Sequence, residues 1–109
     1  MGTSFGGRRR TAPALVAALT DPEAQVRANA ARALSALEAL PAEAVMPLSA
    51  LAGDPDDGVR LNAALALRAA PPGEASAALR RLLADPNPRI RLLAAGSLLA
   101  SDPDDDLAT

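Results

Sequence analysis

Apolar residues recur with helical spacing in three long stretches of the 109-residue chain. In each stretch they return at every third or fourth position, which places them along one face of an α-helix. The positions predicted to pack in this way are Val26, Ala30, Leu34 and Leu37, then Val59, Ala63 and Leu67, and then Ile90, Ala94 and Leu98. The pattern therefore predicts helices over roughly 22–38, 55–70 and 86–100.

A shorter helical pattern precedes each long stretch, over 13–20, 42–53 and 74–84. Helix-stopping residues separate the resulting pairs, because Pro41 follows the first pair and Pro71-Pro72-Gly73 follows the second. Pro47 lies within a short stretch, and we expect a kink or an early break there. The chain is thus predicted to fold as helix pairs over about 11–39, 40–70 and 71–101.

Each long stretch opens with the dipeptide Asp-Pro, at Asp21, Asp54 and Asp85. An aspartate at the N-cap can accept hydrogen bonds from the free amides of the first turn, and proline suits the first helical position. The three dipeptides are 33 and 31 residues apart. Self-similarity at this period indicates a stacked array of helices.

A valine or isoleucine follows each of these aspartates by five residues and an arginine follows by six, as in Asp21, Val26 and Arg27. This pattern resembles the HEAT repeat, and most of all the short bacterial HEAT-like repeats of phycobilin lyases, over about 11–101. The resemblance implies an all-α fold, a right-handed α-solenoid of about three antiparallel helix pairs with six helices.

The resemblance also implies a ladder of aspartate and arginine side chains between neighbouring units. Arg27 would reach toward Asp54, and Arg60 toward Asp85. Arginine suits this role because its planar fork can meet a carboxylate at two points while its stem packs against aliphatic neighbours. Anion binding is the alternative role for these arginines. The full set of ladder residues is Asp21, Arg27, Asp54, Arg60, Asp85 and Arg91.

The two ends of the chain differ in charge from its near-neutral middle. Residues 1–10 carry three arginines and no acid, and we expect them to form a flexible Gly/Arg arm. Residues 102–109 carry four aspartates and no base, and we expect an acidic tail. Residues 7–20 also have the pattern of an export signal, although their apolar part falls where the first helix is needed. Residues 101–108 repeat the opening of 53–60, so they are either a degenerate fourth unit or a helix stop followed by a polar end.

The composition removes most kinds of catalytic and metal site. The chain has no histidine and no cysteine, which excludes the usual zinc ligands, a Ser-His-Asp triad and a thiol nucleophile. It also lacks the glycine-rich phosphate-binding motifs. Gly58 and Leu65 stand where a calcium-binding loop starting at Asp54 would need other residues. We therefore expect a non-enzymatic protein with no cofactor and no metal.

Charge and aromatic content also limit the partners. The formal net charge is −2 and there is no tyrosine or tryptophan, so we expect no nucleic-acid binding by charge attraction or base stacking. No apolar run is long enough to suggest a membrane span, and no cysteine requires an oxidising compartment. These features together predict a cytoplasmic protein with a protein partner.

The leading functional hypothesis is a protein-protein interaction scaffold or adaptor. In the HEAT family the second helix of each pair lines a concave face, where outward-pointing positions are candidate partner-binding residues or ordinary solvated ones. The alternatives are an accessory subunit or homologue of a phycobilin lyase-type enzyme, and a nucleic-acid-binding HEAT-like protein. A homodimer through an exposed end repeat also fits, since about three repeats is the lower limit for a stable array. The candidate partner-binding residues are Asn29, Arg32, Asn62, Arg68, Arg89 and Leu93.

Overall fold

A computed structural model of the chain describes residues 12–71 and 73–101. Over these residues the chain forms six α-helical segments and no strand, which confirms the predicted all-α fold. The predicted arm at 1–10 and the predicted tail at 102–109 lie outside the described residues.

The helices alternate between short and long along the chain. The short helices lie at 12–18, at Val45–Ala50 (α3) and at Ser76–Leu82 (α5). Single 3-10 turns at Ala42–Ala44 and Leu51–Gly53 extend α3 at both ends. The long helices are Ala24–Ser35 (α2), Asp57–Leu67 (α4) and Pro88–Ser101 (α6). No helix in these two segments is long and apolar enough to cross a bilayer.

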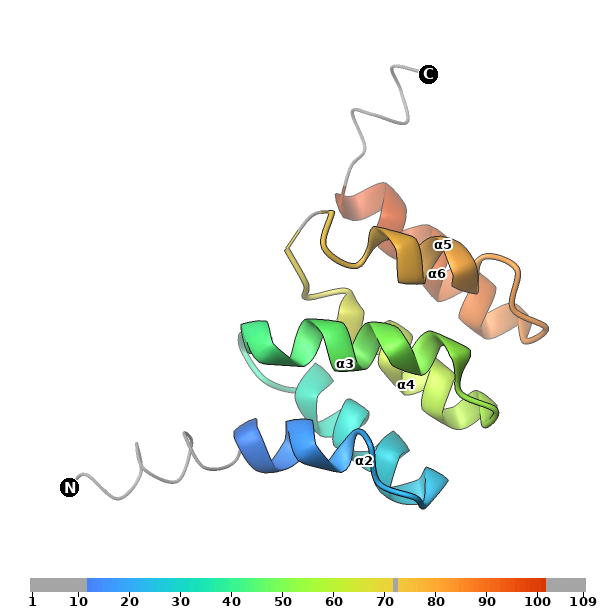
Figure 1. Ribbon diagram of the computed structural model, residues 1–109. Helices are drawn as coiled ribbons and strands as arrows, with labels where there is room; N and C mark the ends of the chain where they lie inside the picture. The colour runs from blue at the N-terminus through green and yellow to red at the C-terminus, as the bar shows by residue number, and fades with distance from the viewer. Residues whose placement is uncertain (1–11, 72, 102–109) are drawn as a thin grey trace.

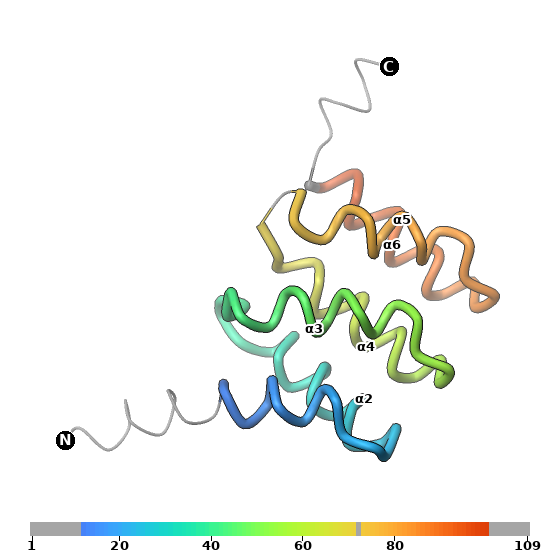
Figure 2. The backbone as a smooth tube through the Cα atoms, in the orientation of Figure 1, coloured from blue at the N-terminus to red at the C-terminus, as the bar shows by residue number. Residues whose placement is uncertain are grey.

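The helices are arranged in two layers, as Figures 1 and 2 show. The helix at 12–18, α3 and α5 form one layer, and α2, α4 and α6 form the other. Helix α4 packs between α2 and α6, while α5 packs against α6 and contacts α3. The described chain is therefore a solenoid-like stack of three helix pairs, in which each pair buries its apolar faces against its neighbours.

The Asp-Pro dipeptides do not cap the long helices, so this prediction is wrong by two residues. Each long helix begins three residues after the aspartate. The Oδ1 atom of each aspartate instead accepts the N–H group two residues further on, which closes an Asx-turn. These hydrogen bonds are Glu23 to Asp21 (2.9 Å), Asp56 to Asp54 (3.0 Å) and Asn87 to Asp85 (2.9 Å).

The residue whose N–H closes the Asx-turn also provides the cap in two of the three pairs. Oδ1 of Asp56 accepts the N–H of Val59 (3.0 Å), and Oδ1 of Asn87 accepts the N–H of Arg89 (2.9 Å). In α2 the corresponding residue is Glu23, which makes no side-chain cap. Because a later residue caps the helix, the carboxylates of Asp54 and Asp85 can contact the preceding helix pair.

Small and branched aliphatic side chains fill the core. Of the predicted packing positions, seven are at most 3% exposed: Ala30, Leu34, Val59, Ala63, Leu67, Ile90 and Ala94. Val26 and Leu98 are half-buried. Leu37 is 37% exposed because α2 ends at Ser35, so its predicted packing role is wrong.

A proline and a glycine lie in the layer of short helices, and the sequence predicts only part of their effect on it. Pro47 produces no break, because α3 begins at Val45 and the proline falls in the first turn, where its missing N–H has no helical partner. The early break expected at that residue is therefore wrong. Gly73 has a φ of 92°, a left-handed conformation that glycine adopts without strain, and it lies in the turn that leads to α5.

The long helices pack closely, so a larger residue at one of their buried alanine positions is expected to destabilise the fold. Ala64 is 0% exposed, as is Ala31 at the equivalent position of α2. We predict that Ala64→Leu lowers the free energy of unfolding by about 1–3 kcal/mol, because the added carbons have no space. Urea unfolding followed by circular dichroism measures the change. The control is Ala77→Leu, at an exposed position of α5, and equal stability of the two variants would contradict the close packing.

Candidate functional site

Arg27 joins the first helix pair to the second through a two-point contact. Its Nε donates to Oδ2 of Asp54 (2.7 Å) and its Nη2 donates to Oδ1 of the same carboxylate (3.1 Å). Its Nη1 donates to the carbonyl oxygen of Asp21 in its own unit (2.7 Å). The guanidinium group therefore connects two successive Asx-turns.

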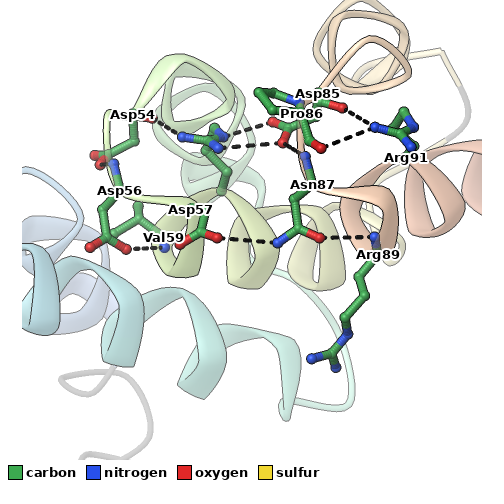
Figure 3. A network of polar contacts seen from close by, with 10 residues as sticks. Asp54, Asp56, Asp57, Val59, Asp85, Pro86, Asn87, Arg89 and Arg91 are labelled. Carbon is green, nitrogen blue, oxygen red and sulfur yellow. Dashed lines mark hydrogen bonds and ion pairs between the residues drawn. The ribbon is translucent and has the colours of Figure 1, made fainter.

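Arg60 repeats this arrangement between the second and third pairs. Its Nε and Nη2 donate to Oδ2 and Oδ1 of Asp85 (2.7 and 3.3 Å), and its Nη1 donates to the carbonyl oxygen of Asp54 (2.8 Å). Figure 3 shows these contacts together with a further link, in which the Asn87 amide donates to Oδ2 of Asp57 (3.2 Å). The ends of α4 and α6 are thereby held at a fixed register.

Both carboxylates of these pairs lie inside the stack. The side chains of Asp54 and Asp85 are only 6% and 4% exposed. Burial alone would raise the pKa of Asp85, but the hydrogen bonds from Arg60 and the Asn87 N–H outweigh it, so the pKa lies below its ordinary value. For the same reasons Arg27 and the Asp56 N–H hold the pKa of Asp54 below its ordinary value.

The paired arginines have few donors left for an external anion. Arg27 and Arg60 each use Nε, Nη1 and Nη2 on oxygens of the protein. Their side chains are 15% and 14% exposed. The geometry therefore favours the structural role of these two residues over anion binding.

The layer formed by α2, α4 and α6 carries two hollows, and we call its outer side the second-helix face. The larger hollow has a volume of about 710 Å³ and lies where α4 and α6 meet, near the end of α2. Leucines supply its apolar wall, and Arg68 and Ser97 supply polar groups. Its lining residues are Ser35, Leu65, Arg68, Ala69, Leu92, Leu93, Gly96, Ser97 and Ala100.

The smaller hollow lies between the first halves of α2 and α4 and has a volume of about 240 Å³. Amide side chains dominate it, since Asn29 accepts from the Gln25 amide (3.2 Å) and Asn62 donates to the Gly58 carbonyl oxygen (2.9 Å). Its lining residues are Ala24, Gln25, Ala28, Asn29, Arg32, Asp56, Gly58 and Asn62.

The candidate partner-binding residues divide between these hollows. Arg68 and Leu93 line the larger one, whereas Asn29, Arg32 and Asn62 line the smaller one. Arg89 lies in the first turn of α6, is exposed, and lines neither hollow. The structure therefore separates a mainly apolar site on α4 and α6 from a polar site on α2 and α4.

Comparison with known proteins agrees with the stacked geometry. A model of the family described as HEAT repeats matches residues 4–68 and again residues 45–109. The chain belongs to the HEAT repeat family. No curated protein matches it.

Two lining residues of the larger hollow depart in type from the repeat pattern that makes this a HEAT array. Gly96 stands where α4 has Leu65 and α2 has Arg32, and a Cβ atom at Gly96 would meet no described atom within 4 Å outside its own helix backbone and chain neighbours. Ser97 stands where α4 has Ala66, is 5% exposed, and its Oγ has no hydrogen-bond partner among the described residues. A third lining residue, Leu92, matches its counterpart Leu61 in type but is 75% exposed, whereas Leu61 packs against the core. Comparing the repeats position by position would have indicated Gly96 and Ser97 but not Leu92, whereas choosing outward-pointing charged and amide residues indicated none of the three.

Loss of one ladder arginine is predicted to destabilise the stack. In Arg60→Met the aliphatic stem is kept, but the Asp85 carboxylate stays buried without its charged partner. We expect the free energy of unfolding to fall by about 2–3 kcal/mol, between the values typical of exposed and fully buried pairs. Chemical unfolding measures it, with Arg89→Met as the exposed control on α6. A loss no larger than that of the control would show that the pair contributes little.

Acidification is predicted to weaken the stack through the same carboxylates. Because the pKa values of Asp54 and Asp85 are lowered on folding, their contribution is complete above the unfolded value of 3.8 and is lost as pH falls through the folded values. In Arg60→Met, burial still raises the pKa of Asp85 and only the Asn87 N–H and the charge of Arg91 oppose it, so the pKa lies higher than in the wild type. The stability difference between the wild type and Arg60→Met should therefore shrink from pH 6 to about pH 3. A difference that is constant or grows over this range would contradict this assignment.

Proposed function

We propose that this HEAT-repeat chain is a non-enzymatic protein-protein interaction module that binds its partner in the larger hollow of the second-helix face. HEAT repeats are commonly interaction scaffolds, and this chain has no histidine or cysteine for the usual catalytic constellations. The likeness of its repeats to those of phycobilin lyases stays a prediction.

The observation that carries the proposal is the way the larger hollow departs from the repeat. Gly96 removes the side chain that Arg32 and Leu65 provide at the same position, which opens space beside the exposed Leu92. Glycine within a helix costs about 0.5–1 kcal/mol relative to alanine. Gly96 destabilises its helix although a side chain would fit there. We therefore infer that the open space serves to admit a group of the partner.

The chemistry of the hollow indicates what a partner would present. Leu65, Leu92 and Leu93 offer apolar surface for an aliphatic or aromatic side chain. Arg68 at the same hollow is exposed and can pair with a carboxylate of the partner. A protein segment that carries an apolar side chain beside an acidic one fits these groups.

Filling the hollow is predicted to abolish binding without loss of fold. In Gly96→Leu the new side chain occupies the space, as Leu65 does at the equivalent position in α4. In Gly96→Ala only one carbon is added, so most of the space remains. Both variants should unfold at a higher denaturant concentration than the wild type, since both residues form helices better than glycine.

Affinity capture from an extract of the expressing cells, quantified by mass spectrometry, tests the prediction. A protein retained by the wild type and by Gly96→Ala, but lost with Gly96→Leu, supports the proposal. Binding of that protein should also weaken with Arg68→Glu and persist with Arg80→Glu on the other layer. Capture that is the same for all variants, or the absence of any retained protein, rejects the larger hollow as the binding site.

A further inference from the structure

Arg91 occupies in α6 the position that Arg27 and Arg60 occupy in α2 and α4. Its Nη1 donates to the carbonyl oxygens of Asp85 and Pro86 (2.8 and 3.1 Å), so the contact within its own unit is formed. Among residues 12–71 and 73–101, no carboxylate accepts from its Nε and Nη2. Arg91 is also exposed, unlike its two counterparts.

The apolar residues near Arg91 are also more exposed than their counterparts in α4. Leu92 is 75% exposed, whereas its counterpart Leu61 packs against the core. Ala95 is half-buried, whereas its counterpart Ala64 is 0% exposed. We call Arg91, Leu92 and Ala95 the end face, because they are the residues whose equivalents in α4 are paired, packed or fully buried within the stack.

At the opposite end of the stack, Asp21 lacks, among the described residues, the arginine partner that its two counterparts have. Asp21 is the counterpart of the two buried ladder aspartates, yet it is half-buried, and no arginine of the two described segments contacts its carboxylate. Among the described residues, its Oδ1 accepts the N–H of Glu23 (2.9 Å) and no other group. Val26 beside it is half-buried, whereas its counterpart Val59 is 0% exposed.

We propose that the chain associates end to end with a second copy of itself, with Arg91 of one copy donating through Nε and Nη2 to the Asp21 carboxylate of the next. These groups are the two unmatched halves of a pair that is formed twice inside the chain. The contact would therefore reproduce an arrangement already compatible with the stacking of α2, α4 and α6. Leu92 would gain apolar cover on the same contact, next to Val26.

The charges of the two end groups favour the same orientation. Arg91 is cationic and Asp21 is anionic, so the end that carries Arg91 attracts the end of the next copy that carries Asp21. Opposite charges at the two sides of a contact favour encounter and disfavour the reversed orientation.

The proposed contact joins two different surfaces, so it does not close on itself as a symmetric dimer would. Each added copy leaves a new end face free, and the expected assembly is a linear series whose length grows with concentration. This differs from the homodimer expected from the number of repeats alone.

Sedimentation velocity of the full chain at low salt, over roughly 10 µM to 1 mM, tests the proposal. The mean mass of the wild type should rise steadily with concentration. Arg91→Asp and Asp21→Arg, each alone, should weaken association by about tenfold or more, since each places like charges in contact. An equimolar mixture of these two variants should associate again, because every mixed contact then holds one arginine and one aspartate.

Circular dichroism must first show that each variant keeps the helix content of the wild type, so that loss of association reports the contact and not the fold. Restored association in the mixture then requires a contact between molecules. Arg89→Asp is the matched control on the same turn of α6, and it should associate as the wild type does. A wild type that stays monomeric over this concentration range overturns the proposal. A mixture that fails to restore association overturns it as well.

Discussion

The stack depends on keeping two aspartates charged in a place where water hardly reaches them. A buried carboxylate is costly unless it is paired and hydrogen-bonded. Asp54 and Asp85 meet both requirements, since an arginine of the preceding unit contacts both oxygens and a turn amide donates to one of them. Sliding one helix pair along the next would leave such a carboxylate without its arginine, so the pairs specify the register as well as contributing to stability. Apolar alanine and leucine surfaces alone would tolerate several registers.

Much of this architecture can be predicted from the sequence because the same residue pattern occurs three times along the chain. The apolar periodicity, the period of the repeat and the Asp-Pro dipeptides are enough to predict six helices. The resemblance of the Asp/Val/Arg spacing to the HEAT repeat then implies the pairs Arg27–Asp54 and Arg60–Asp85. The starts of the long helices could not be placed, because an aspartate followed by proline suits both an N-cap and an Asx-turn. All three dipeptides form the Asx-turn, including Asp21, whose carboxylate contacts no arginine of the described residues, so the choice is made locally. The end of α2 could not be placed either. Apolar residues continue with helical spacing to Leu37, but the helix ends at Ser35.

The larger hollow was harder to predict because it arises from exceptions to the repeat. Residues that match between units, such as Asn29 and Asn62, lie in the smaller, polar hollow. The apolar hollow is lined by a glycine and a serine that break the repeat, and by a leucine that matches the repeat but is exposed in the third unit. None of them has the charge or amide chemistry that usually attracts attention on a helix surface. In a repeat protein, shared residues mainly report stacking, so a position that breaks the pattern is the better guide to a binding surface.

The double use of the Oδ1 atoms has a consequence for how the chain folds. In Asp54 and in Asp85 one oxygen accepts both the amide of its own turn and the guanidinium of the preceding unit. The turn that starts a long helix and the junction with the previous pair therefore share an atom and stabilise each other. Neighbouring units should then gain order together, so that their amides exchange with solvent in one concerted event. Three pairs linked in this way behave as a single cooperative unit rather than as three small domains on a string.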